Sequence, residues 1–105
     1  MVGFLEFEGE YLNGEKNGEL KEFDSHRILI FEGEYLNGKK NGNGKEYDND
    51  KLIFEGKYLN GEKIGYGKEY FQNGNLLYKG DYLNGKFNGK GKLYFYNGEL
   101  RFECF

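Results

Sequence analysis

The chain has 105 residues, among them 18 Gly, 10 Phe and 10 Tyr, with neither Pro nor Trp. Its 18 acidic and 15 basic side chains give a net charge of −3, which argues against nucleic acid, since phosphate binding needs a basic field. An aromatic fraction of 19% argues against a disordered chain, because such chains are poor in aromatic residues. Abundant aromatics and glycines, with no alanine, predict an all-β fold with tight turns and no helix.

One eight-residue block recurs four times along the chain, at spacings of 24, 23 and 24 residues. Its copies begin at Phe7, Phe31, Phe54 and Tyr78. A fixed period in this range is typical of stacked repeat units. We therefore predict a single repeat array over residues 1–105, with units at 7–30, 31–53, 54–77 and 78–101 and a partial fifth strand at 102–105.

The first part of each unit alternates strictly between two kinds of residue. In the second copy Leu29, Phe31, Gly33 and Tyr35 alternate with Ile30, Glu32 and Glu34. A period of two predicts a β-strand with one apolar and one charged face. The structural positions that recur on the apolar face are Gly9, Gly33, Gly56 and Gly80, and Tyr11, Tyr35, Tyr58 and Tyr82. We expect the tyrosine row to form the core between units, and the glycines to admit a neighbouring ring or backbone.

Turn signals divide each unit further. Leu-Asn-Gly at 12–14, 36–38, 59–61 and 83–85 predicts hairpin turns. A second glycine pair follows in each later unit, at 42–44, 65–67 and 89–91, and the first unit keeps only Asn17-Gly18 of it. We interpret these glycines as turn elements rather than phosphate-binding loops, because no helix follows them. Short second strands at 21–23, 45–47, 68–70 and 92–94 and further turns near 24–26, 48–50, 72–74 and 96–98 complete the units. Each unit is thus a hairpin, and the stack is a twisted antiparallel ribbon about 40 Å long.

The charged face carries two rows in register, Glu8, Glu32 and Glu55 beside Lys21, Lys45, Lys68 and Lys92. Opposite charges on neighbouring strands can pair for ~0.2–1 kcal/mol each, and the plainer reading is a solvated charged face.

No catalytic constellation stands out in the sequence. The single histidine, His26, lies in a predicted turn, and the single cysteine, Cys104, is interpreted as a small packed thiol. We therefore predict no catalytic residue, no metal, no cofactor and no enzymatic activity. With no apolar run near the ~20 residues of a membrane span and no signal-peptide pattern, the expected location is intracellular, in the cytoplasm or at the periphery of cytoskeleton or membrane.

The repeated pattern of aromatic-Glu-Gly-Glu-aromatic, Asn-Gly and Gly-x-Gly resembles the MORN repeat family. The best copies are residues 31–44 and 78–91, and the four units match over residues 7–101. Residues 73–77, Asn-Gly-Asn-Leu-Leu, also resemble the bacterial YwqK-type variant of the repeat. The resemblance implies an elongated ribbon of hairpins with an aromatic-lined groove, used for scaffolding, protein binding or membrane attachment. This chain departs from the family pattern in having Tyr where Trp is common.

The aromatic residues outside the repeated block are the candidate binding residues: Tyr47, Tyr66, Tyr70, Phe71, Phe87, Tyr94 and Tyr96. Exposed aromatic rows favour binding of a protein or peptide segment in a groove. Three alternatives stay open: attachment to anionic phospholipid through Lys39-Lys40 or Lys86, Lys90 and Lys92; carbohydrate binding; and a piece of a larger enzyme whose chemistry lies elsewhere. Open ribbon ends also allow self-association.

Overall fold

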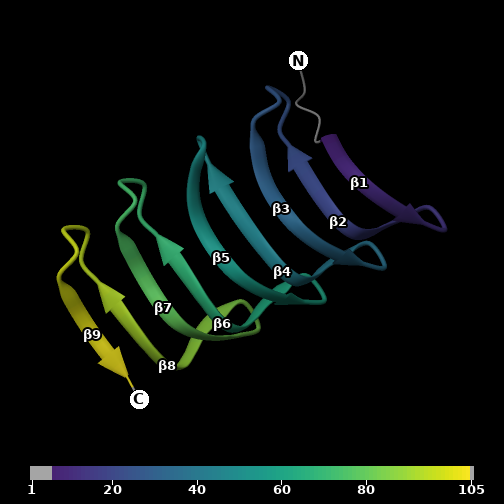
Figure 1. The fold of residues 1–105 in the computed structure, drawn as a ribbon. Helices are drawn as coiled ribbons and strands as arrows, with labels where there is room; N and C mark the ends of the chain where they lie inside the picture. Colours follow the sequence, from purple (N-terminus) through teal and green to yellow (C-terminus); the bar gives the residue numbers. More distant parts are fainter. Residues whose placement is uncertain (1–5, 105) are drawn as a thin grey trace.

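The computed structural model describes residues 6–104, which form one antiparallel sheet whose nine strands are neighbours in sequence order (Figure 1). The strands are β1 (Glu6–Leu12), β2 (Glu15–Phe23), β3 (Leu29–Leu36), β4 (Lys39–Asp48), β5 (Lys51–Leu59), β6 (Glu62–Tyr70), β7 (Leu76–Leu83), β8 (Lys86–Tyr94) and β9 (Leu100–Cys104). We call the pairs β1–β2, β3–β4, β5–β6 and β7–β8 units one to four. The predicted all-β ribbon of hairpins is confirmed, and residues 6–104 contain no helix.

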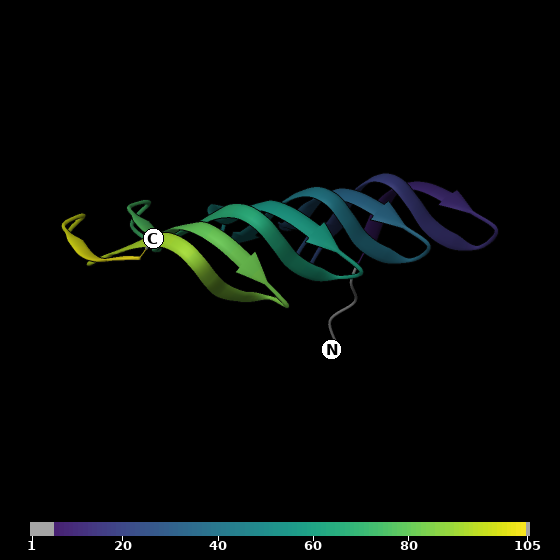
Figure 2. The ribbon, with the colours of Figure 1, turned by 90° about the horizontal axis from the view of Figure 1, so that it is seen from below.

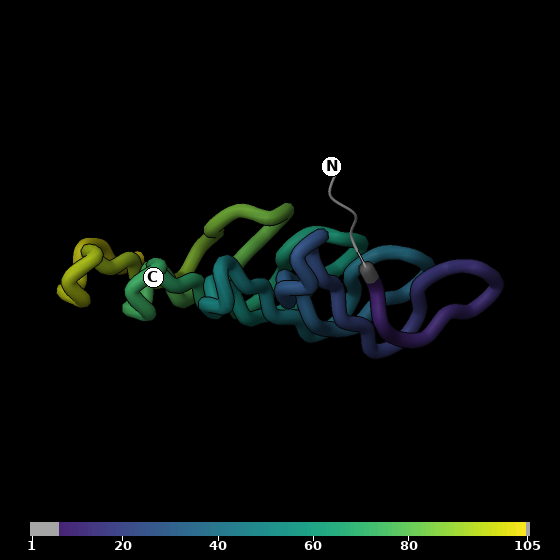
Figure 3. Tube along the Cα trace, turned by 90° about the horizontal axis from the view of Figure 1, so that it is seen from above, coloured from purple at the N-terminus to yellow at the C-terminus, as the bar shows by residue number. Residues whose placement is uncertain are grey.

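The sheet is elongated, with principal extents of 44 × 28 × 19 Å. Figures 2 and 3 show it from below and above, as a single row of curved hairpins with no second layer packed on it. A single layer has no partner sheet to cover its apolar side chains. The core must therefore be built between successive hairpins of the same sheet.

The predicted Asn-Gly hairpin turns are confirmed. In the turn between β3 and β4, Asn37 and Gly38 have φ of 51° and 81°, the pair of positive values that defines a type I′ turn. The equivalent pairs 13–14, 60–61 and 84–85 adopt the same conformation. Each turn from unit two onward is also fastened to the preceding unit, because its glycine N–H donates to a lysine carbonyl there (Gly38 to Lys16 at 3.0 Å, Gly61 to Lys40 at 2.8 Å, Gly85 to Lys63 at 3.1 Å).

The second glycine pairs are not turns, and this prediction was wrong. Asn41-Gly42 lies inside the continuous strand β4, at a point where the pairing register with β3 shifts between Gly33 and Tyr35. Gly42 has φ of 100°, and the glycines at 18, 65 and 89 are also positive. Extra residues on one strand of a pair are a β-bulge, which uses the same positive φ as a turn. The second strands are consequently nine or ten residues long, rather than three.

In the turn that joins units one and two, Arg27 adopts a left-handed backbone conformation that is strained for a residue with a side chain. Asp24 N–H donates to Ile28 O, Arg27 N–H donates to Asp24 O, and Arg27 has φ of 64°. The turns after β6 and β8 make the same pair of hydrogen bonds, with Gly74 and Gly98 at the positive-φ position.

We expect Arg27→Gly to raise the free energy of unfolding by about 0.5–1 kcal/mol, because only glycine adopts a left-handed conformation without a steric cost. Urea unfolding followed by circular dichroism measures the difference. Gly74→Arg in the equivalent turn is the reverse control and should lower the stability by a similar amount.

The core is a zigzag of aromatic rings that crosses from unit to unit. Phe31 and Phe54 are each 1% exposed. Phe31 makes edge-to-face contacts with Tyr35 of its own unit and Tyr58 of the next, with ring centroids 5.8 and 5.6 Å apart. Phe54 contacts Tyr58 and Tyr82 in the same way, at 5.6 and 5.4 Å. Edge-to-face pairs are favoured by the ring quadrupoles, so the contacts of Phe31 with Tyr58 and of Phe54 with Tyr82 couple adjacent hairpins.

Tyr11 differs from the other three tyrosines at its repeat position because it is exposed. The prediction that all four tyrosines of this row are core is correct for Tyr35, Tyr58 and Tyr82, but Tyr11 is 54% exposed. The buried tyrosines at 58 and 82 each contact a phenylalanine of the preceding unit, and residues 6–104 place no unit before Tyr11. At the same end Leu20 is 2% exposed and occupies the position that is glycine in the other units.

Lysine side chains close the open side of the aromatic stack. The Nζ atoms of Lys16, Lys40 and Lys63 lie 3.4, 4.2 and 4.1 Å from the ring centroids of Phe7, Phe31 and Phe54. An ammonium over an aromatic face is attracted by the ring quadrupole while its methylenes cover apolar surface. In unit four the same repeat position is Phe87, which stacks on Tyr78 at 3.8 Å.

Tyrosine hydroxyls of the core bond to glutamates of the preceding unit. Tyr35 Oη donates to Glu22 Oε1 at 2.9 Å, and Tyr58 Oη donates to Glu46. Burial, followed by the neighbouring glutamate, raises the pKa of both tyrosines above their ordinary value. Tyr82 differs, because its buried hydroxyl makes no hydrogen bond of normal geometry among the described residues, and burial followed by the charge of Glu69 raises its pKa. The equivalent carboxylate, Glu69, accepts from Lys63 Nζ at 3.3 Å.

The two tyrosines give a matched test of this hydroxyl. Tyr35→Phe removes a hydrogen bond to a buried carboxylate and should cost about 1.5–3 kcal/mol of unfolding free energy. Tyr82→Phe removes a hydroxyl that makes no such bond and should change the stability by less than about 0.5 kcal/mol. Urea unfolding at pH 7 measures both variants. Equal losses would contradict the assigned pairing.

Candidate functional site

The sheet face opposite the aromatic core carries a long trough. It runs across β1 to β6 with a volume of about 800 Å³. Its floor is the backbone of cross-strand glycine pairs, Gly33 with Gly44 and Gly56 with Gly67. The side chains along its walls are Glu8, Glu19, Lys21, Glu32, Asn43, Lys45, Glu55, Lys57, Tyr66 and Lys68. Successive residues of a strand face opposite sides, so a side chain at these glycine positions would point to the core face, and the trough lies over the backbone between the side chains of the neighbouring residues.

The two walls of the trough are rows of side chains on either side of the glycines. Glu32 and Lys45 precede and follow the pair Gly33–Gly44 on one side, and Asn43 stands on the other. Side chains two residues apart on a strand are separated by about 7 Å. The two rows are therefore closer together than the diameter of an α-helix with its side chains, which measures roughly 10–12 Å.

A second hollow of about 310 Å³ continues over β6 to β9. It is lined by Tyr66, Lys79, Gly80, Asp81, Lys90, Gly91, Lys92, Glu103 and Cys104. Tyr66 lines both hollows and is 56% exposed. A binding segment that ran the length of the sheet would have to pass over this ring.

One wall of the trough is braced by tyrosines. Tyr47 Oη donates to Glu32 Oε1 at 2.7 Å, and Tyr70 Oη donates to Glu55 Oε1 at 3.0 Å. Burial, and then the bonded glutamate, raises the pKa of Tyr47 and of Tyr70 to about 12. The bonds hold the two carboxylates in fixed positions on the wall.

We expect the stability of the protein to fall as the pH rises from 10 to 12. Tyr47 and Tyr70 keep their protons in the folded state up to about pH 12, whereas an unfolded tyrosine loses its proton near pH 10. Their contribution is therefore complete below pH 10 and is lost as the pH approaches 12. Urea midpoints between pH 9 and 12 measure the decline, which should be shallower in the double variant Tyr47→Phe, Tyr70→Phe.

The predicted glutamate and lysine rows are in register, but they form few close ion pairs. Glu32 lies opposite Lys21 on one side and Lys45 on the other. Among residues 6–104 the sole pair from these rows within 4.0 Å involves Lys92, whose Nζ lies 3.2 Å from Glu103 Oε2. The lysines of the wall are consequently available to a ligand, while Glu32 and Glu55 are held by tyrosines.

The seven candidate aromatics do not form one groove. Only Tyr66 lines the trough, and Tyr47 and Tyr70 support its wall from behind the carboxylates. Phe87 lies on the core face against Tyr78. The other three are distributed around β8 and the turns, where Phe71 and Tyr96 pair at 5.2 Å and Tyr94 is half-buried. The aromatic-lined groove stays a prediction, and the hollow on this face is lined mainly by glycines and charged side chains.

A row of exposed leucines was also missed by sequence reasoning. Leu12, Leu36, Leu59 and Leu83 precede the Asn-Gly turns and are 46–57% exposed. The sequence gives no sign of this exposure, because an apolar residue such as leucine is expected to be buried.

His26 is exposed in its predicted turn, and Cys104 is an exposed free thiol in β9 rather than a packed one. Within residues 6–104, His, Cys, Asp and Glu side chains nowhere gather in threes that could hold a metal ion.

Comparison with known families identifies the repeat. The family model of the MORN repeat matches residues 7–19, 31–52, 54–76 and 78–99. The chain belongs to the MORN repeat family. Each matched segment begins within the first strand of one unit, so there is one repeat for each hairpin. A search among curated proteins found no match.

Membership of the MORN family indicates the general kind of role of this protein. MORN repeats are non-catalytic and generally mediate binding to proteins or membranes. The structure holds no helix, among the residues it describes, with the length and apolar character of a membrane span.

Proposed function

We propose that this MORN array is a non-enzymatic scaffold that binds an extended protein segment in the trough. The observation that carries the proposal is the trough itself, an open hollow of about 800 Å³ that crosses six strands. Its floor is strand backbone, which a ligand can approach closely because the side chains of the floor positions belong to the core face, and its walls offer both carboxylates and free ammonium groups. Tyr66 adds one exposed ring, the kind of residue that anchors peptides.

Attachment to anionic lipid has less support from the arrangement of the lysines. Lipid headgroups require a cluster of basic side chains that faces one plane. Lys40 lies over the ring of Phe31, and Lys92 is paired with Glu103. The two basic patches expected for lipid are thereby each reduced by one ammonium group.

A peptide selection with two matched tyrosine variants tests the proposal. Twelve-residue peptides would be selected from a random displayed library on the immobilised protein, and their affinities measured by titration calorimetry. Tyr66, in the trough, and Tyr96, outside it, are 56% and 58% exposed. Tyr66→Ala should weaken the selected peptides about tenfold or more, and Tyr96→Ala less than about twofold. The opposite order would place binding outside the trough, and failure to select any binder would count against the proposal.

A further inference from the structure

The walls of the trough change sign along the ribbon. At one repeat position units one to four carry Glu8, Glu32, Glu55 and Lys79. At another they carry Glu19, Asn43, Tyr66 and Lys90. All of these side chains line the trough or the hollow that continues it. A third position is lysine in every unit, and a fourth lines the hollows only in units three and four, as Lys57 and Asp81.

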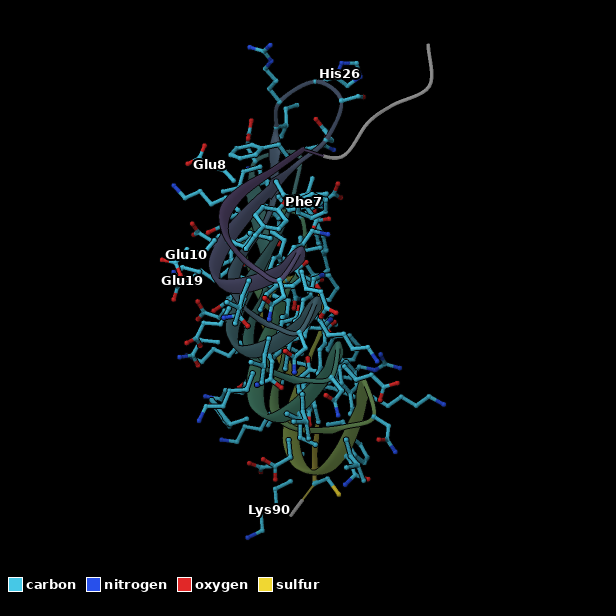
Figure 4. The ribbon with its side chains drawn as sticks, turned by 90° about the vertical axis from the view of Figure 1, so that its right-hand side faces the viewer. Phe7, Glu8, Glu10, Glu19, His26 and Lys90 are labelled. Carbon is cyan, nitrogen blue, oxygen red and sulfur yellow. The ribbon has the colours of Figure 1, made fainter. Side chains whose placement is uncertain are left out.

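The formal charge of the lining side chains changes from negative in unit one to positive in units three and four. The sets are Glu8, Glu19 and Lys21 in unit one (−1), Glu32 and Lys45 in unit two (0), Glu55, Lys57 and Lys68 in unit three (+1), and Lys79, Asp81, Lys90 and Lys92 in unit four (+2). Strand β9 adds Glu103, which pairs with Lys92 and brings the net charge at this end of the hollow to +1. Figure 4 shows Glu8, Glu10 and Glu19 together on one side of the sheet near β1, with Phe7 turned to the other side and Lys90 at the far end.

We infer that the partner is an extended segment with segregated charge, whose basic half lies over units one and two and whose acidic half lies over units three and four. The inference rests on the proposed function and names the partner's chemistry. Complementary potentials fix the orientation of a bound segment and suppress the reverse orientation. A peptide with the same residues in mixed order would place like charges together at some units wherever it bound.

The dimensions of the sheet set the length and spacing of this segment. Strands lie about 4.8 Å apart, so β1 to β8 span roughly 34 Å and successive units are about 10 Å apart. An extended chain advances about 3.3 Å per residue. The fitting segment therefore has about ten to twelve residues, with a charge at every third residue facing the walls.

Two synthetic twelve-residue peptides of equal composition test the inference. One carries two lysines in its first half and two glutamates in its second, at every third position with Gly and Thr between, and the other has the charges in alternating order. Titration calorimetry at low salt should show at least about tenfold tighter binding of the segregated peptide, and the difference should shrink at 0.5 M salt because screening weakens exposed charges. Equal affinities, or no binding of the segregated peptide, would overturn the inference. In either case selected peptides that still depend on Tyr66 would leave the proposed function standing.

A charge-reversal variant with a matched control locates the effect. The double change Lys79→Glu, Lys90→Glu removes the basic end of the trough and should abolish the preference for the segregated peptide. Lys39→Glu, Lys51→Glu alters the net charge equally at exposed residues outside the trough and should preserve it. A nitroxide on the basic end of the peptide should broaden the amide signals of β1 and β2. Broadening at β7 and β8 instead, or loss of preference in the control, would contradict the assigned orientation.

Discussion

Replacing Gly33 by alanine is expected to lower the free energy of unfolding by about 3 kcal/mol or more. A Cβ at this position would lie 2.5 Å from Asn43 O and 2.7 Å from Gly44 Cα, both backbone atoms of the paired strand. Neither atom can move away without separating β3 from β4, so the overlap must distort the ladder. Overpacking in a dense region typically costs about 1–3 kcal/mol, and backbone neighbours place this case at the upper end.

Gly61→Ala is the control for this substitution. Gly61 is in an Asn-Gly turn with φ of 88°, and a Cβ there would have no neighbour within 4 Å. Its replacement should cost only the strain of a left-handed conformation, about 1–2 kcal/mol. Guanidinium unfolding of the two variants separates close packing from backbone strain. A loss at Gly33 no larger than that at Gly61 would contradict the role given to the glycine pairs.

Truncation of Phe54 is the second large effect that we expect, with a loss of about 3–5 kcal/mol. The ring is 1% exposed and contacts Tyr58 and Tyr82, which belong to different units. Its removal leaves a cavity, breaks two edge-to-face contacts and deprives the ammonium of Lys63 of the ring 4.1 Å away. Because each unit contacts only its neighbours, the loss should uncouple unit three from unit four.

Phe102 provides a control from the same repeat position. It stands in β9 where Phe54 stands in β5, but it is 58% exposed. Phe102→Ala should therefore cost less than about 1 kcal/mol. Thermal and urea unfolding would be compared for the two variants, together with hydrogen exchange of β7 and β8. Similar costs at Phe54 and Phe102 would show that coupling between units does not pass through this ring.

Much of the architecture could be predicted from the repeated block. Its period-two alternation indicated the strands, Asn-Gly indicated type I′ turns, and the glycine of Phe-Glu-Gly indicated close approach of a ring. The second glycine pair was misread because Gly42 adopts a positive φ in a bulge just as a glycine does in a turn. Local sequence does not distinguish the two, since the difference lies in whether pairing with β3 resumes on both sides.

The contacts that cross between units could not be predicted in the same way. Lys40 has the character of a surface residue in the sequence, but it pairs with Tyr35 across the strands and its ammonium lies over the ring of Phe31. Glu32 was expected to pair with lysine, but the hydroxyl of Tyr47 occupies it instead. Comparison of the units in the sequence does indicate the charge of the trough, because one repeat position changes from glutamate at Glu8 to lysine at Lys79. A charge that varies at a fixed repeat position is more informative about binding than the constant block that builds the sheet.

The most direct test of the binding face is a titration of the ¹⁵N-labelled protein with a selected peptide, followed through the glycine amide signals. The trough-floor glycines are Gly33, Gly44, Gly56 and Gly67, and the turn glycines are Gly14, Gly61 and Gly85. If the trough binds the segment, the floor signals shift with a common saturation curve and the turn signals stay in place. Shifts confined to the turn glycines, with the floor unchanged, would contradict the assignment of the binding site to the trough.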